Sequence, residues 1–218
     1  MRYAPVAICL LALCLPTVAW ANDNFTVVLH ARTPSGTGTC TAAGLPNCVG
    51  IRPTTQVAAN TEFRLYIFIN NHTALGAMQT GFQWPADWVA TPTGEPPFFF
   101  SCRGDTPAHT PVNPGGPIHG TLALAFECFT SPALCAIGRI DFFAGAGGCL
   151  EQINPIQGTG RVEVLDCQNN STTLDATTPH GQSRLGSICV GVPGRDACDA
   201  ITTAVEPATW GSVKATYR

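Results

Sequence analysis

Nine cysteines follow an N-terminal segment with the features of a secretory signal, and together they constrain the fold more than any other part of the sequence. The first 21 residues contain Arg2, an apolar run over 6–15 and the small-residue cleavage site Ala19-Trp20-Ala21. Removing this segment leaves cysteines at positions 40, 48, 102, 128, 135, 149, 167, 189 and 198. The sequence therefore predicts an exported chain that is held by disulfides, with one thiol left over.

Short spacings between cysteines favour local disulfide loops. A Gly/Thr/Pro-rich stretch separates Cys40 from Cys48, which predicts a bridge between these two. The spacing of Cys128 and Cys135 predicts a second local bridge. Two alternatives stay open for a further bridge, Cys167 with Cys189 or Cys189 with Cys198. The odd cysteine is expected to be buried rather than reactive.

Composition limits the number of domains and the classes of partner. Residues 22–198 have the size of one large β-sandwich domain, and residues 199–218 are expected to form a tail or a short helix after it. Without Arg2 the chain has ten basic and fourteen acidic residues, a formal charge of −4, which argues against binding to nucleic acid. Lys214 is the single lysine, and no later apolar stretch approaches the roughly 20 residues of a membrane span.

Alternation of apolar and polar residues predicts a chain made of strands. The strongest pattern covers residues 62–70, whose Phe63, Leu65, Ile67 and Ile69 share one face, and its partly apolar second face predicts a central position in a sheet. A turn then leads to a strand over 77–84, expected to pair with it in antiparallel fashion. Further strands are expected over 25–31, 98–102, 121–129, 136–144, 161–167 and 187–192. Eight or nine strands with this spacing predict an all-β fold, a two-sheet antiparallel sandwich of cohesin-like or immunoglobulin-like type.

The order of these segments resembles that of the cohesin-like β-sandwich of secreted bacterial proteins. The segments that carry the resemblance are 59–65, 78–84, 120–124, 137–142, 160–165 and 187–190. The resemblance implies a non-catalytic binding or scaffold module, because cohesins pair with dockerins and related sandwiches bind carbohydrate. No calcium loop of the dockerin type occurs in the sequence, so the class of partner stays open.

An aromatic cluster follows the strand over 77–84 and is a candidate ligand-binding site. Trp84, Trp88 and the run 98–100 could stack on sugar rings, with Asp87, Gln83 and Arg103 supplying hydrogen bonds. The alternative is that these rings fill the sandwich core. Since three consecutive phenylalanines cannot all point inward, Trp88 and Phe99 are the rings expected to be exposed.

The C-terminal tail is a candidate partner-binding segment. Trp210, Val213 and Tyr217 have helical spacing beside Lys214, and Thr209 could cap a short helix. Such a tail has apolar anchors to bury against another protein, or else packs on its own domain.

No arrangement of residues specifies a reaction. Gly181-Gln182-Ser183-Arg184-Leu185 lacks the second glycine of a nucleophile elbow, and the five histidines have no metal-ligand spacing, so neither a cofactor nor a metal is expected. The sequence thus favours an exported non-catalytic binding, adhesion or scaffold module whose partner is an extracellular or cell-surface protein or a polysaccharide. The expected location is secreted, periplasmic or cell-surface. A carbohydrate-binding module is the alternative, and a secreted hydrolase is a remote one.

Overall fold

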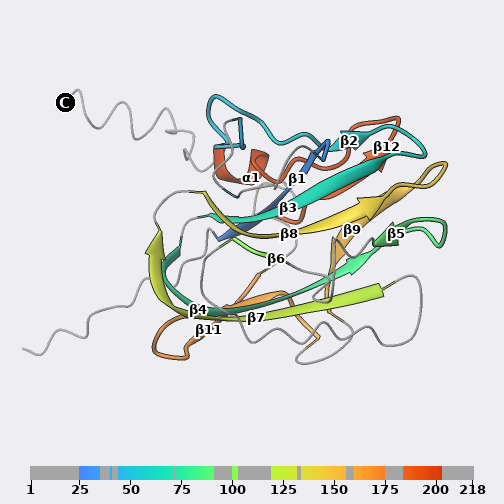
Figure 1. Cartoon of the computed structure of the whole chain (residues 1–218). Helices are drawn as coiled ribbons and strands as arrows, with labels where there is room; N and C mark the ends of the chain where they lie inside the picture. Colours follow the sequence, from blue (N-terminus) through green and yellow to red (C-terminus); the bar gives the residue numbers. More distant parts are fainter. Residues whose placement is uncertain are drawn as a thin grey trace, which may run out of the picture.

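Two β-sheets pack face to face in the structure, a computed structural model (Figure 1). It describes residues 25–34, 40, 44–70, 72–90, 100–102, 119–131, 134–155, 160–174 and 184–202. The strands in this part of the chain are β1 Thr26–Arg32, β2 Gln56–Val57, β3 Glu62–Asn70, β4 His72–Gln83, β5 Val89–Ala90, β6 Phe100–Ser101, β7 His119–Ser131, β8 Cys135–Phe143, β9 Cys149–Ile153, β10 Glu163–Leu165, β11 Ser171–Thr173 and β12 Ser187–Val190. One helical turn follows, α1 Asp199–Thr202. The predicted all-β two-sheet sandwich is confirmed.

The first sheet has the order β1-β3-β8, with β5 and β6 both paired to the outer edge of β8. All of these pairs are antiparallel. β3 lies between β1 and β8, as its apolar second face predicted, and seven of its nine residues are buried. A register shift between Ile67 and Phe68 marks a bulge in the β3–β8 ladder.

The second sheet is built around the long strand β4. β7 pairs with one edge of β4 from His72 to Gln83, while β10 and β9 pair with the other edge one after the other. β12 and β2 continue the sheet beyond β9, and β11 continues it beyond β10. β2 and β12 run parallel, which departs from the predicted antiparallel pattern.

The expected antiparallel pairing of β3 with β4 is wrong. β3 ends at Asn70 and β4 begins at His72, yet the two strands belong to different sheets. Both edges of β3 are already taken by β1 and β8, so the chain crosses to the second sheet instead of turning back. Alternation along a strand shows which residues share a face but not which strand lies beside it.

The main core lies between the sheets. It receives alternate residues of each strand, among them Leu65 and Ile67 of β3 and Met78 and Phe82 of β4, all 2% exposed or less. Thr80 lies on the same inward face of β4, and its hydroxyl accepts a hydrogen bond from the Gln152 amide of β9 at 2.8 Å. These two buried polar side chains are therefore paired with each other.

The cysteine pairing differs from every pairing expected from the spacing. The four disulfides are Cys40–Cys102, Cys48–Cys198, Cys128–Cys167 and Cys149–Cys189. The predicted Cys40–Cys48 and Cys128–Cys135 bridges are wrong, and so are both alternatives for Cys189.

Strand placement gives the physical reason for two of these differences. Cys128 and Cys135 lie on β7 and β8, which belong to different sheets. Cys149 and Cys189 lie directly opposite each other in the β9–β12 ladder, with 4.1 Å between their Cα atoms. Cys135 takes part in none of the four disulfides, as expected for one cysteine in nine, and its thiol lies 3.7 Å from the Ala136 carbonyl oxygen.

Candidate functional site

The aromatic residues expected to bind a ligand lie inside the sandwich. Trp88 is 2% exposed and Trp84 is 9% exposed, so the expectation of an exposed Trp88 ring is wrong. Trp88 packs edge-on against Phe63, and Trp84 packs edge-on against Phe142, with centroid distances of 5.7 and 5.5 Å. These two rings therefore cannot form an exposed platform for sugar stacking.

Asp87 and Trp88 hold the turn between β8 and β9. The Asp87 carboxylate accepts a hydrogen bond from the Ala146 backbone N–H, and the Trp88 indole N–H donates to the Gly147 carbonyl, both at 2.8 Å. A side chain at Gly145 would place its Cβ 2.0 Å from the Asp87 carboxylate, so only glycine fits there. Both residues therefore have a structural role. Phe99 and Arg103 lie outside the described residues, as do the tail residues Trp210, Val213, Lys214 and Tyr217.

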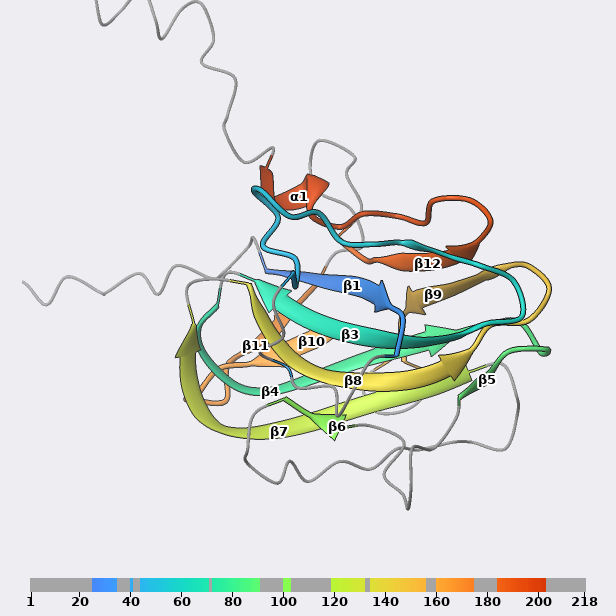
Figure 2. The ribbon, with the colours of Figure 1, turned by 45° about the horizontal axis from the view of Figure 1, so that its top comes forward.

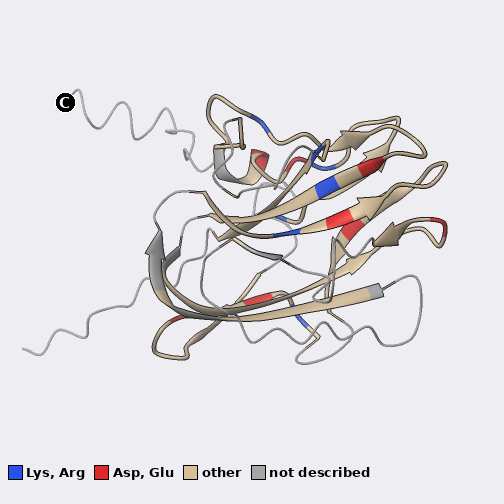
Figure 3. Cartoon of the chain, in the orientation of Figure 1, with Lys and Arg blue, Asp and Glu red and all other residues tan. Residues whose placement is uncertain are grey.

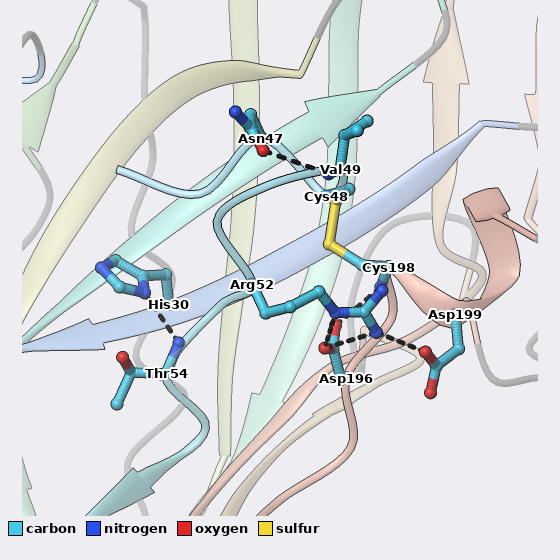
Figure 4. Close-up of polar contacts among 9 residues, drawn as sticks. All are labelled: His30, Asn47, Cys48, Val49, Arg52, Thr54, Asp196, Cys198 and Asp199. Atoms are coloured by element: carbon cyan, nitrogen blue, oxygen red, sulfur yellow. Dashed lines mark hydrogen bonds and ion pairs between the residues drawn. A yellow bond between two sulfur atoms is a disulfide. The ribbon is translucent and has the colours of Figure 1, made fainter. Parts of the chain in front are cut away.

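A tight turn on the outer face of the first sheet is the candidate functional site. We call residues 47–52 the knuckle. The Asn47 side-chain oxygen accepts three backbone N–H groups, those of Val49, Gly50 and Ile51, at 3.1, 2.9 and 2.9 Å. Figure 4 shows the contact with Val49. The backbone N–H groups of Asn47 and Cys48 donate to the Ile51 carbonyl at 3.0 and 3.2 Å. Five hydrogen bonds thus close a loop of five residues.

Two apolar side chains project from this closed loop. Val49 is 89% exposed and Ile51 is 41% exposed, and Val49 is the most exposed large apolar residue of the described chain. Cys48 has φ of 62°, a left-handed conformation that costs a non-glycine residue roughly 1 kcal/mol or more. The strained residue Cys48 thus directly precedes the most exposed apolar side chain of the knuckle.

Long-range contacts attach the knuckle to the end of the domain. The Cys48–Cys198 disulfide joins residues 150 positions apart. Next to it, the Arg52 guanidinium contacts Asp196 at 2.7 Å and also forms an ion pair with Asp199 (Figure 4). Partial burial alone would lower the pKa of Arg52, but the hydrogen bonds that its guanidinium donates to Asp199 and Asp196 outweigh burial and raise the pKa.

A second hydrophobic cluster lies under the knuckle. It combines Cys48, Cys198 and Ala197 with Val28 of β1 and with Tyr66 and Phe68 of β3. All six are 2% exposed or less. The outer face of the first sheet is therefore covered by the knuckle and the 196–199 segment, and the disulfide holds this cover in place.

His30 of β1 lies at the edge of the same cluster and is 5% exposed. Its ring nitrogen Nδ1 accepts a hydrogen bond from the Thr54 backbone N–H at 2.9 Å (Figure 4). Its ring lies 6.2 Å from that of Tyr66 and 6.4 Å from that of Phe68, between centroids. Burial, with a smaller contribution from the Arg32 charge, lowers the pKa of His30 to about 4. The folded chain thus keeps this imidazole neutral well below pH 6.

Stability should therefore fall as the pH decreases from about 6.5 to about 4. In this range the unfolded chain binds a proton at His30 and the folded chain does not, so the free energy of unfolding decreases by about 3 kcal/mol. Urea unfolding between pH 4 and 8 measures this slope. The His30→Asn variant keeps an acceptor for Thr54 but does not titrate, and should lack that part of the slope. If the free energy of unfolding of the variant depends on pH as steeply as that of the wild type, His30 is not the group responsible.

Opposite charges lie side by side on β3 and β8 of the same outer face (Figure 3). The Arg64 Nε donates to an Asp141 oxygen at 2.8 Å, and Arg139 Nη1 lies 3.9 Å from the same oxygen. All three residues are 8% exposed or less. Burial alone would lower the pKa of Arg64, but the hydrogen bond to Asp141 raises it. This group ties the two strands together.

The described residues contain no cluster of three His, Cys, Asp or Glu side chains able to hold a metal ion. Within the same residues, no helix is long and apolar enough to cross a membrane.

The knuckle presents two apolar side chains on an ordered backbone, which suits it to an apolar contact. The sequence does not reveal the knuckle, because Val49 and Ile51 follow no periodic pattern and the cysteine that holds them lies 150 residues away. Asn47, a turn-forming residue three positions before Gly50, is the local signal that could have indicated a closed turn.

The structures similar to this chain are cohesin modules. The cohesin module of a Clostridium perfringens family 33 glycoside hydrolase is 11% identical, with a TM-score of 0.43 over 76% of this chain and 96% of that one. The second type II cohesin of the ScaA adaptor scaffoldin from Acetivibrio cellulolyticus is 8% identical, with a TM-score of 0.43 over 67% and 89%. Type II cohesin A11 from Bacteroides cellulosolvens is 12% identical, with a TM-score of 0.40 over 55% and 86%. The similarity to these modules is limited to the backbone fold. The chain matches no protein-family model and no curated protein.

Proposed function

We propose that this chain is an exported, non-catalytic binding module that holds a protein partner through the knuckle. The observation that carries the proposal is the 89% exposure of Val49 on a loop closed by five hydrogen bonds and a disulfide. Export is supported by the signal-like residues 1–21 and by four disulfides, which persist in oxidising compartments such as the periplasm or the cell exterior.

Rigidity is what makes this apolar pair suitable for binding. Association normally costs free energy for ordering loops and side chains at the interface. The knuckle has already been ordered on folding, so less of the free energy gained by burying its side chains is lost to ordering. Burial against a partner contributes about 1.5–3 kcal/mol for Val49 and less for Ile51, which is only 41% exposed. A protein surface with an apolar pocket fits this contact better than a polysaccharide, because sugar stacking needs exposed aromatic rings and both Trp84 and Trp88 are buried.

Photo-crosslinking from the knuckle tests the proposal. A photoreactive phenylalanine analogue placed at position 49 should form a covalent adduct with a partner in cells that export the chain. The matched control is the same analogue at Val192, which is also exposed, at 57%, but lies in the turn after β12. An adduct from position 49 and none from 192 is expected. Equal adducts at both positions, or an adduct at 192 alone, would rule out the knuckle as the contact.

A further inference from the structure

β7 has one edge that no described strand occupies. Its thirteen residues, His119–Ser131, pair with β4 on one side, and no strand pairing in the described part of the chain involves the other side. Backbone N–H and C=O groups point alternately to the two edges of a strand. About half of the backbone groups of β7 are thus directed toward its second edge, where they can bind another strand.

The sequence of β7 lacks the residues that usually block such an edge. Residues 119–131 contain no proline, lysine or arginine and a single acidic residue. Natural edge strands are commonly short, charged or interrupted by proline, which prevents them from pairing with other chains. β7 is long and mostly apolar, so it resembles an edge that is kept open for pairing.

Small side chains beside this edge leave room for larger ones. Ala123 and Ala125 of β7 face the outer surface of the sheet, together with Ala77 of β4 and Leu165 of β10. They line a shallow hollow of about 270 Å³, in which Glu163 is the charged residue. A strand added beside β7 would place alternate side chains about 5 Å from Ala123 and Ala125, so an aromatic or branched residue could lean over the alanines.

Residues 212–218 of the chain have the pattern of such a strand. Val213, Ala215 and Tyr217 alternate with the polar residues Ser212, Lys214, Thr216 and Arg218. The pattern thus combines an apolar face, suited to the alanine surface, with a basic face.

We infer that the open edge of β7 binds residues 212–218 of a second copy as an added strand, which joins copies head to tail. Residues 203–218 follow α1 in the sequence, and in both views α1 lies on the opposite side of the two sheets from β7 (Figures 1 and 2). An edge on one side and a strand donor on the other form a heterologous contact, which can continue from copy to copy. This inference does not depend on the knuckle.

The mass of the exported full-length chain in solution tests the inference. Sedimentation velocity over a hundredfold range of concentration should show dimers and longer species that increase with concentration. Removal of residues 207–218 should leave a monomer with unchanged circular dichroism and melting temperature. A labelled peptide of residues 207–218 should bind this truncated chain, and the same residues in scrambled order should not.

Variants of the edge separate the proposed contact from others. Ala125 is exposed, so Ala125→Lys should leave the fold intact while it places a charge against the apolar face of the added strand, weakening peptide binding about tenfold. Thr173→Lys adds the same charge on β11 of the same sheet and should have little effect. A full-length chain that is monomeric at every concentration would overturn the inference. If the peptide still bound the truncated chain, each tail would occupy the β7 edge of its own copy. If the peptide did not bind, the β7 edge would not accept the tail. Assembly that survives Ala125→Lys would overturn it as well.

Discussion

Replacing both Cys48 and Cys198 with alanine is expected to lower the free energy of unfolding by about 5 kcal/mol. The disulfide closes a loop of 150 residues, and in the chain-entropy model a crosslink stabilises a fold more when the loop is longer. Its loss also releases the segment that covers Val28, Tyr66 and Phe68. Guanidinium unfolding of the oxidised double variant measures the change.

The Cys149→Ala/Cys189→Ala variant is the matched control. That disulfide closes a loop of 40 residues across two paired strands, and the same model gives it about 4 kcal/mol. Only the Cys48/Cys198 variant should also speed amide hydrogen exchange at residues 48–51. A loss of less than about 2 kcal/mol, with exchange at the knuckle unchanged, would show that the disulfide does not hold the knuckle.

Changing Asp141 to asparagine is expected to lower the free energy of unfolding by about 3–5 kcal/mol. The carboxylate neutralises Arg64 at 2.8 Å and lies 3.9 Å from Arg139, and all three side chains are buried. Asparagine keeps the shape but removes the carboxylate charge that pairs with the buried Arg64 guanidinium, the costly way to break a buried ion pair. Urea unfolding at neutral pH measures the loss.

Replacing the whole charged group provides the control for Asp141→Asn. The triple variant Arg64→Met/Arg139→Met/Asp141→Leu removes the charges together and keeps similar side-chain volume, so it should cost less than the single change. If Asp141→Asn unfolds at the same denaturant concentration as the wild type, the ion pair is not a determinant of stability. Equal losses in the single and triple variants would show that packing, and not charge, is responsible.

Strand alternation predicted much of the fold. The bounds of β3 match the predicted residues 62–70, and Met78, Thr80 and Phe82 face inward as their spacing indicated. Local pattern also identified β8 and β12 to within one or two residues at most ends. These elements were predictable because an amphipathic strand must bury one face, whatever its neighbours are.

Contacts between distant segments could not be predicted in the same way. Cys40 is only eight positions from Cys48, yet Cys48 forms its disulfide with Cys198. The reason is that the knuckle and the segment after β12 both lie over β1 and β3, which brings the two cysteines together. Trp88 follows a turn and belongs to no alternating run, so its burial depends on Phe63 and on the β8–β9 turn. The knuckle was missed for the same reason, since its exposure depends on what lies beneath it.

The most direct test of the account is the affinity of the partner crosslinked at position 49 for purified wild-type, Val49→Asp and Val192→Asp chains. Both substituted residues are exposed, so neither change should alter the melting temperature. We expect Val49→Asp to weaken binding about a hundredfold and the Val192→Asp chain to bind as the wild type does. Unchanged affinity of the Val49→Asp chain would contradict the knuckle as the binding site.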